Sequence, residues 1–138
     1  MSFARRIVLD TGVLVSAAIR ADSVPALALE KALLNFEVCV SRDTLAELVA
    51  VLSRPKLDRY APPRQREDFA AGFRARAVVV EVTAMISDCV DPKDNMFPAL
   101  AETAEADLIV SSDPHPTHLH PWHGIPILLP TAFLAGIR

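Results

Sequence analysis

Short apolar runs that alternate with longer helix-like segments constrain the fold of this chain more than any other feature. Five runs have the length and composition of buried strands, at residues 7–9, 37–40, 78–80, 108–110 and 125–129. Segments of helical character lie between them and are expected to begin at Ser23, at Ser41–Asp43, near Pro63, at Asp94 or Asn95, and at Thr131. Parallel strands need crossover connections, which helices supply. The alternation therefore predicts an α/β fold of three α/β/α layers, with a central parallel sheet of about five strands.

The length and composition predict a single domain over residues 1–138. No linker or low-complexity tract divides the chain, and 51% hydrophobic residues suffice for a continuous core. Cys39 and Cys89 stand among apolar neighbours, which favours buried thiols in a reducing compartment over a disulfide. The apolar run before Asp10 is too short for a signal peptide or a membrane span. We therefore expect a cytoplasmic protein without membrane contact.

Acidic residues stand where the strands of such a sheet end. Asp10 directly follows the first strand, and Asp113 follows the fourth. Asp91 and Asp94 lie between the third strand and the next helix, while Glu47 lies one turn into the helix after the second strand. Ligands of parallel sheets bind beyond the carboxyl ends of the strands. The order of elements thus directs these acids toward one rim.

Each of these acids also has an ordinary structural interpretation. Asp91 and Asp94 would serve as helix caps, Asp10 and Asp113 as turn residues that close strand ends, and Glu47 as a surface residue beside the buried stripe of its helix. Carboxylates gathered at one rim, however, resist joint ionisation unless a cation lies among them. Oxygen ligands without well-spaced His or Cys suit Mg²⁺ or Mn²⁺ rather than zinc. Such an ion activates a bound water and neutralises phosphate charge, so the acids favour phosphodiester hydrolysis.

At these residues the sequence resembles the PIN-domain family of nucleases, and more narrowly the PIN-type proteins classed as toxins of toxin–antitoxin pairs. The resemblance covers nearly the whole chain. It rests on IVLDT at residues 7–11, VLVS at 13–16, Ser41 followed by Glu47, LSRPK at 52–56, DPKDN at 91–95, IVSSD at 109–113, GIPI at 124–127 and TAFL at 131–134.

The resemblance implies a PIN-like fold and metal-dependent cleavage of single-stranded RNA, frequently by dimers, with an antitoxin protein as partner. The implied ligands of Mg²⁺ or Mn²⁺ are Asp10, Glu47, Asp94 and Asp113. Asp91 is an alternative to Asp94, because the DPKDN spacing does not say which carboxylate turns inward, and Asn95 is a candidate auxiliary ligand. Candidates to hydrogen-bond these carboxylates and fix their rotamers are Thr11, Ser16 and Ser112, with ordinary turn hydrogen bonding as the alternative.

One departure from the family lies directly after Asp10 and Thr11, where the family usually has Asn and this chain has Gly12. Gly12 removes a hydrogen-bonding side chain from the predicted site. It therefore supports a competing hypothesis, in which a PIN-like module binds nucleic acid or protein with weak or absent activity. Asp10-Thr11-Gly12 also matches the aspartic-protease signature, but that class needs an all-β fold, which the helical spacing downstream opposes.

Basic residues concentrate in one stretch. Half of the fourteen Lys and Arg residues fall there, namely Arg54, Lys56, Arg59, Arg64, Arg66, Arg74 and Arg76. The net charge of −3 argues against a protein that coats nucleic acid by bulk electrostatics. The stretch predicts either a solvated helical face or a face that contacts RNA phosphates, with Arg54 and Lys56 as the leading contacts; a protein-partner or dimer interface is a further alternative.

All four histidines of the chain lie in the segment 115–123, which follows Asp113 and also contains Trp122. The spacing matches no standard zinc pattern, and the prolines indicate a stiff surface loop. The functional alternative is substrate contact, in which Trp122 stacks on an unpaired base.

Overall fold

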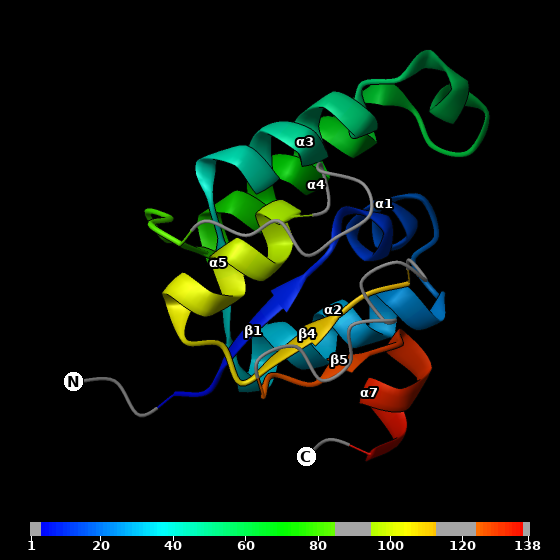
Figure 1. Cartoon of the computed structure of the whole chain (residues 1–138). Coiled ribbons are helices and arrows are strands. Elements are labelled where there is room, and N and C mark those ends of the chain that lie inside the picture. Colours follow the sequence, from blue (N-terminus) through cyan, green and yellow to red (C-terminus); the bar gives the residue numbers. More distant parts are fainter. Residues whose placement is uncertain (1–3, 85–94, 113–123, 137–138) are drawn as a thin grey trace.

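The sheet is parallel throughout and has five strands (Figure 1). A computed structural model of the chain describes residues 4–84, 95–112 and 124–136. The strands are β1 (Arg6–Leu9), β2 (Glu37–Val40), β3 (Val78–Val79), β4 (Leu108–Val110) and β5 (Ile127–Leu128), in the spatial order β3-β2-β1-β4-β5. The predicted α/β class and five-stranded parallel sheet are confirmed.

The central strand β1 ends level with its neighbour β4. Leu9 pairs with Val110, and the backbone N–H of Asp10 donates to the carbonyl of Val110 at 3.0 Å. Asp10 and Ser111 are therefore the first residues beyond the ends of two adjacent parallel strands. This register brings the two residues to the same edge of the sheet.

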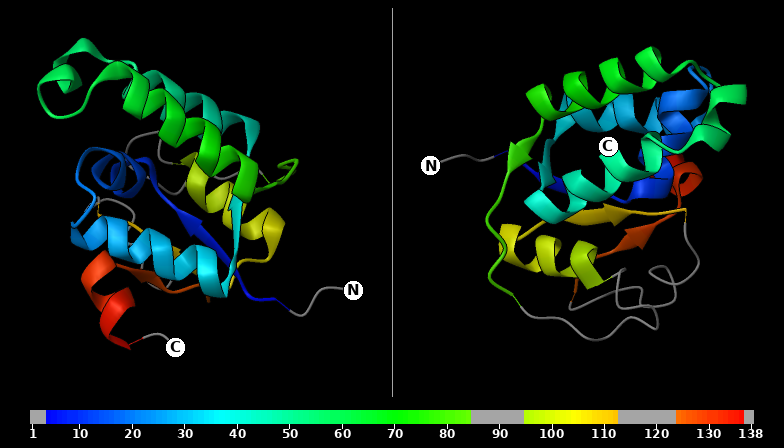
Figure 2. Two further views of the ribbon diagram at one scale, coloured as in Figure 1. Left: turned by 180° about the vertical axis from the view of Figure 1, so that it is seen from behind. Right: turned by 90° about the horizontal axis from the view of Figure 1, so that it is seen from above.

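Helices cover both faces of the sheet, as the three-layer prediction required (Figures 1 and 2). Successive side chains of a strand point to opposite faces. On β1, Val8 packs in a core with α5 (Met96–Ala104), whereas Ile7 and Leu9 pack in a second core. That second core holds residues of α1 (Thr11–Ile19), α2 (Val24–Asn35) and α7 (Pro130–Gly136). Both faces of the central strand are thus buried.

Side-chain caps explain where two of the helices begin. Ser23 Oγ accepts from the backbone N–H of Ala26 at 3.2 Å at the start of α2. Ser41 and Thr44 form a capping box at the start of α3 (Arg42–Leu52), since each side chain bonds the other's backbone N–H. These caps satisfy donors that have no partner within the helix. The predicted helix starts at Ser23 and Ser41 are confirmed.

The structure adds elements that the sequence pattern did not predict. Residues Thr11–Ile19 form α1, a helix capped by Asp10, and Pro55–Arg59 form the 3-10 turn η1. Residues 11–19 are mostly apolar and show little helical periodicity, and the segment 55–59 is too short to show a helical periodicity. Strand β5 spans only Ile127–Leu128, shorter than the predicted 125–129.

Helices α3 and α4 (Pro63–Arg76) form a hairpin joined by η1, and its tip projects from the body of the molecule (Figures 1 and 2). The tip of this hairpin, residues 54–64, carries the first part of the basic stretch.

Cys39 is a free thiol, 1% exposed on β2. Burial raises its pKa; the charge of Arg6 acts in the opposite direction, and Glu37 adds to the rise. The prediction of a buried thiol is confirmed for Cys39, and Cys89 lies outside the described residues. No single helix in the described residues is long and apolar enough to span a membrane, although α1 and α2 together meet that length and hydropathy test across a bend of 109°.

Candidate functional site

Asp10 is the buried carboxylate of the candidate site. It is 4% exposed and caps α1, with Oδ1 accepting from the backbone N–H of Val13 at 3.0 Å. Oδ2 accepts from the hydroxyl of Ser111, which is fully buried at the end of β4. The carboxylate is therefore held by groups from a helix and from a neighbouring strand, which fixes its rotamer.

Glu47 reaches the same place from α3. The hydroxyl of Thr11, the residue that follows Asp10, donates to Glu47 Oε2 at 2.5 Å. This hydrogen bond links α3 to the start of α1. Glu47 is half-buried, and it takes no part in the Arg6–Glu37 or Arg66–Asp58 ion pair. The structure thus brings together Asp10, Thr11 and Glu47, three of the residues that the sequence singled out.

The two serines after β4 differ in their surroundings. Ser111, which sequence reasoning did not select, donates to Asp10, whereas the predicted Ser112 is exposed. The register of β1 with β4 decides between them, and no local sequence signal does. Ser112 lies beside Gly12 instead: a Cβ built on Gly12 would lie 2.9 Å from Ser112 Oγ and 3.6 Å from Asp10 Oδ1.

Two other predicted residues, Ser16 and Asn95, take no part in the hydrogen bonds described above for Asp10 and Glu47. Ser16 is half-buried in α1, and no hydrogen bond joins its side chain to the described part of the chain. Asn95 is the N-cap residue of α5 and lines a pocket of about 260 Å³ with Ser41 and Asp43. Asp91, Asp94, Asp113, Trp122 and the histidine-rich segment 115–123 lie outside the described residues.

The donor set at this edge is made of oxygen atoms. Asp10 and Glu47 supply carboxylates, and Thr11, Ser111 and Ser112 supply hydroxyls. Hard divalent cations such as Mg²⁺ and Mn²⁺ prefer oxygen ligands. Among residues 4–84, 95–112 and 124–136, no three acidic, His or Cys side chains lie close enough together to hold a metal ion. The described residues therefore fit part of such a site and do not complete one.

A family model of the PIN domain matches residues 6–115. The chain belongs to the PIN-domain family. The match spans the strand end at Asp10, the helix that carries Glu47 and the end of β4, which are the elements that form the candidate site.

Solved structures of similar fold come from bacterial toxin–antitoxin proteins. VapBC2 of Rickettsia felis, solved with a DNA fragment from its promoter, matches with a TM-score of 0.61 and 16% identity over 88% of this PIN domain and 96% of that chain. DNA-bound VapBC of Salmonella typhimurium matches with a TM-score of 0.61 and 17% identity over 91% and 98%. VapC20 of Mycobacterium tuberculosis, a toxin that cleaves the sarcin–ricin loop, matches with a TM-score of 0.53 and 16% identity over 78% and 89%. A comparison with curated protein sequences gives no match.

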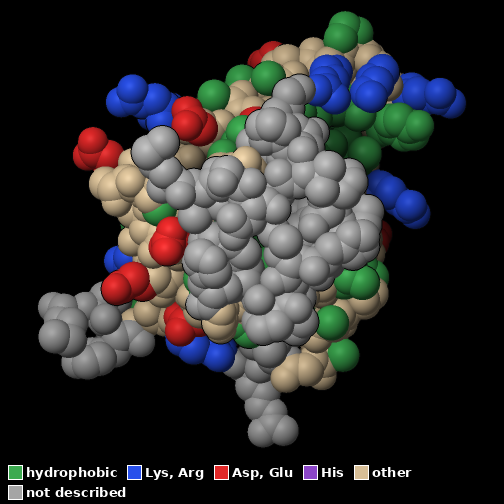
Figure 3. Space-filling model, viewed as in Figure 1, with side chains coloured by type: hydrophobic (Ala, Val, Ile, Leu, Met, Phe, Trp, Pro, Cys, Tyr) green, Lys and Arg blue, Asp and Glu red, His purple; other side chains and the backbone are tan. Residues whose placement is uncertain are grey.

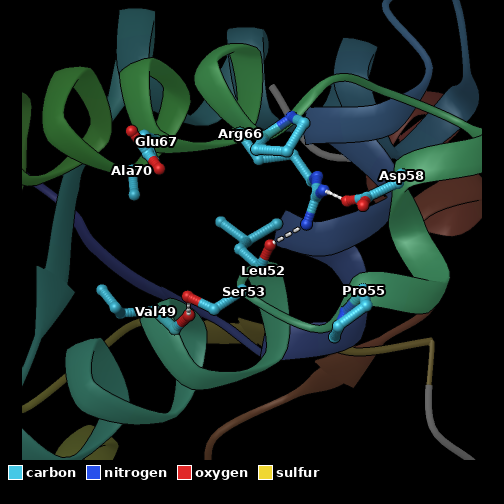
Figure 4. A pocket seen from close by; sticks show the side chains of 9 residues that line it. Val49, Leu52, Ser53, Pro55, Asp58, Arg66, Glu67 and Ala70 are labelled. Atoms are coloured by element: carbon cyan, nitrogen blue, oxygen red, sulfur yellow. Dashed lines mark hydrogen bonds and ion pairs between the residues drawn. The ribbon is translucent and has the colours of Figure 1, made fainter.

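The basic residues of this PIN domain do not share one face, because Arg66 is buried. It is 2% exposed, and its guanidinium donates to the carbonyl of Leu52 and pairs with Asp58 (Figure 4). The guanidinium also donates to the carbonyls of Arg54 and Ala61. Arg66 is therefore not available for a phosphate, and the predicted basic face is wrong in that respect. The contacts of Arg66 instead hold the hairpin tip in place.

Four of the exposed basic residues of the basic stretch lie at the hairpin tip, whereas Arg74 and Arg76 are exposed at the far end of α4. Figure 3 shows Lys and Arg side chains over the tip. The exposed basic residues of the tip are Arg54, Lys56, Arg59 and Arg64. Tyr60, which sequence reasoning missed, is 58% exposed among them, and the guanidinium of Arg59 lies 5.2 Å from its ring centroid. An aromatic residue interleaved with Arg and Lys in a proline-bounded turn is the signal that would have found it.

Proposed function

We propose that this PIN domain is a metal-dependent endoribonuclease that hydrolyses phosphodiester bonds of single-stranded RNA. The observation that carries the proposal is the buried carboxylate of Asp10, held at the carboxyl edge of the sheet with Glu47 one hydrogen bond away from its neighbour Thr11. Ligands of open parallel sheets bind at this edge, and carboxylate oxygens are ligands that Mg²⁺ and Mn²⁺ prefer. Family membership supports the assignment of this acid to catalysis.

We assign Asp10, Glu47, Asp94 and Asp113 as the groups that would hold Mg²⁺ or Mn²⁺. Asp91 remains the alternative to Asp94, and Asn95 is the auxiliary candidate at the start of α5. A divalent cation at this edge would supply a more acidic water and neutralise charge on the phosphate.

The chain's own residues prepare the site for this chemistry. The bonds from Val13 N–H and Ser111 hold the Asp10 carboxylate in one rotamer, so little reorganisation is needed when the substrate arrives. The hydroxyl of Thr11 fixes one oxygen of Glu47. The other oxygen makes no hydrogen bond within the described part of the chain, and we assign it to the attacking water. Fixed outer groups of this kind tune metal affinity and activity in many metalloenzymes.

The hairpin tip and Trp122 are the proposed RNA contacts. Arg54 and Lys56 are exposed where the tip begins, and phosphate contacts from such residues position RNA without reading its bases. Tyr60 adds an exposed ring on which an unpaired base would stack. Trp122 is proposed for the same role from the sequence.

We further propose that the nuclease is the toxin of a toxin–antitoxin pair, acts in the cytoplasm as a dimer and is restrained by an antitoxin protein. The support is the fold shared with VapC-type proteins, two of which were solved as DNA-bound VapBC complexes. A neighbouring reading frame for a small antitoxin-like protein would support this assignment further.

Asp10→Asn tests the proposal through RNA cleavage. Asparagine is as good a helix N-cap as aspartate, so we expect the fold and the cap of α1 to survive while cleavage in Mn²⁺ falls below detection. Fluorescent single-stranded RNA with Mn²⁺ or with EDTA gives the readout, and Asp43→Asn, an exposed acid in the first turn of α3, is the control. Undiminished cleavage by Asp10→Asn would remove Asp10 from the active site.

The second candidate function is a PIN-like module that binds nucleic acid or protein without cutting RNA. The observation that favours it is Gly12, which stands where the family usually has Asn. A binding module would keep its affinity for the partner after Asp10→Asn, and the wild type would show no metal-dependent cleavage.

A further inference from the structure

We infer that Ser112 is a positioning residue of the proposed site, and that Gly12 and Ser112 form a pair in which the serine hydroxyl occupies the space of the missing side chain. The inference rests on the proposed nuclease function and adds a group to it. It also gives Gly12 a role, where the second candidate function treats this residue as a loss.

The steric relation between the two residues is direct. A Cβ on Gly12 would lie 2.9 Å from Ser112 Oγ, closer than real Cβ contacts, so a side chain at residue 12 and the present position of the hydroxyl exclude each other. The same Cβ would lie 3.6 Å from Asp10 Oδ1. The shared space is therefore at the buried carboxylate itself.

Backbone conformation does not explain the glycine. Among the described glycines only Gly124 has a positive φ, whereas Gly12 is the second residue of α1 and has helical geometry. Glycine inside a helix is less favourable than alanine by up to about 1 kcal/mol. The close approach of Ser112 means that a side chain at residue 12 would turn the serine hydroxyl away from its present position.

The hydroxyl of Ser112 is also the one that the fold leaves available. Ser111 uses its hydroxyl on Asp10 Oδ2, whereas Ser112 is exposed and makes no hydrogen bond within the described part of the chain. A water or a phosphate oxygen beside Asp10 would find a donor there. The polar group that the family usually places on residue 12 thus comes from the end of β4.

A double-mutant cycle tests the pair. The variants are Ser112→Gly, Gly12→Asn and the double variant Gly12→Asn/Ser112→Gly, measured by RNA cleavage rate and by the rise in melting temperature that Mn²⁺ causes. We expect each single variant to lose about tenfold or more in rate and part of the Mn²⁺ response, because outer groups of metal sites have effects of this size. The double variant should recover to within about threefold of wild type, since Asn then fills the space that the serine leaves.

Gly72→Asn is the matched control, because Gly72 is also helical and no atom lies within 4 Å of its Cβ position. Melting without metal shows that each variant folds, and Gly12→Ser with Ser112→Gly repeats the cycle with a smaller polar side chain if Asn prevents folding. Single effects that add in the double variant, or single variants that match wild type, would overturn the pairing and leave the nuclease proposal intact. A wild type that neither cleaves RNA nor responds to Mn²⁺ would overturn both.

Discussion

Asp10 combines a structural and a proposed chemical role in one side chain. Its Oδ1 satisfies an otherwise unpaired N–H at the start of α1, and its Oδ2 receives the hydroxyl of Ser111 from β4. The N-terminus of a helix also favours negative charge. The same contacts that stabilise the fold at this point therefore fix the carboxylate that we propose as a metal ligand.

The hydrogen bond from Thr11 to Glu47 can be tested by substitution. Thr11→Val keeps the shape of the side chain but removes the donor to Glu47 Oε2, so the Glu47 carboxylate should lose its fixed orientation. We expect RNA cleavage to fall about tenfold to a hundredfold, with a smaller Mn²⁺ response. Thr11→Ser keeps the hydroxyl and should stay within a few-fold of wild type; equal rates for Val and Ser would show that the bond does not matter for the site.

Single residues of the site were predictable to different degrees. Asp10 and Glu47 could be placed from a strand end and a helix position, and Thr11 from its place beside Asp10. Ser111 could not, because its bond to Asp10 depends on the pairing of Leu9 with Val110. The approach of Ser112 to Gly12 depends on the same register, which a local sequence pattern does not contain.

The hairpin of α3, η1 and α4 shows how one buried arginine can shape an exposed element. The last carbonyls of a helix have no partner within it, and Arg66 donates to the carbonyl of Leu52, the last residue of α3 (Figure 4). Arg66 also donates to the carbonyls of Arg54 and Ala61, which lie further along the chain. A cavity of about 220 Å³ lies beside these contacts, between α3, η1 and α4. The tip is therefore fixed from within, although its outer surface is charged.

Arg66→Met should destabilise the protein by about 3 kcal/mol, because it leaves buried carbonyls without donors. Chemical denaturation followed by circular dichroism measures this change in the free energy of unfolding. Arg64→Met, at an exposed position of the same helix, should change it by less than about 0.5 kcal/mol. Similar losses for both variants would mean that Arg66 does not hold the tip.

The charge of the tip leads to a prediction about salt. If Arg54 and Lys56 bind phosphates, replacement of both by Gln should weaken the binding of unrelated single-stranded RNAs alike and lower the salt slope by about 0.7 for each phosphate that is no longer neutralised. Binding is measured with the inactive Asp10→Asn protein at several salt concentrations. Arg74→Gln/Arg76→Gln, at the far end of α4, is the charge-matched control. An unchanged slope for the tip variant would assign these residues to solvent or to a protein partner.

The architecture of the molecule is built on a parallel sheet whose central strand, β1, is buried on both faces. The order β3-β2-β1-β4-β5 places β1 and β4 side by side in the middle, so the residues after them share one edge. That edge is where open α/β sheets bind their ligands. The proposed active site is thus a consequence of strand order together with the residue types at two strand ends.

The alternation of strands and helices predicted this architecture, because each buried strand is a short apolar run bounded by turn residues. The pattern missed α1, whose residues are apolar on several sides, since the helix is covered by α2, α3 and α4. It also overestimated β5, where the apolar run 125–129 continues beyond the paired residues Ile127 and Leu128. Hydrophobic periodicity identifies helices and strands that bury one face. It is a weaker guide to a helix packed against several others and to the ends of an edge strand.

Melting of the wild type and of Asp10→Asn with and without millimolar Mn²⁺ tests the central claim most directly. A ligand that binds only the folded state stabilises it by about 2.7 kcal/mol at a hundredfold excess over its Kd. We predict that Mn²⁺ raises the melting temperature of the wild type by several degrees, in a concentration-dependent manner, and leaves that of Asp10→Asn unchanged. Equal melting temperatures with and without Mn²⁺ in the wild type, or the same rise in both proteins, would contradict a metal site built on Asp10.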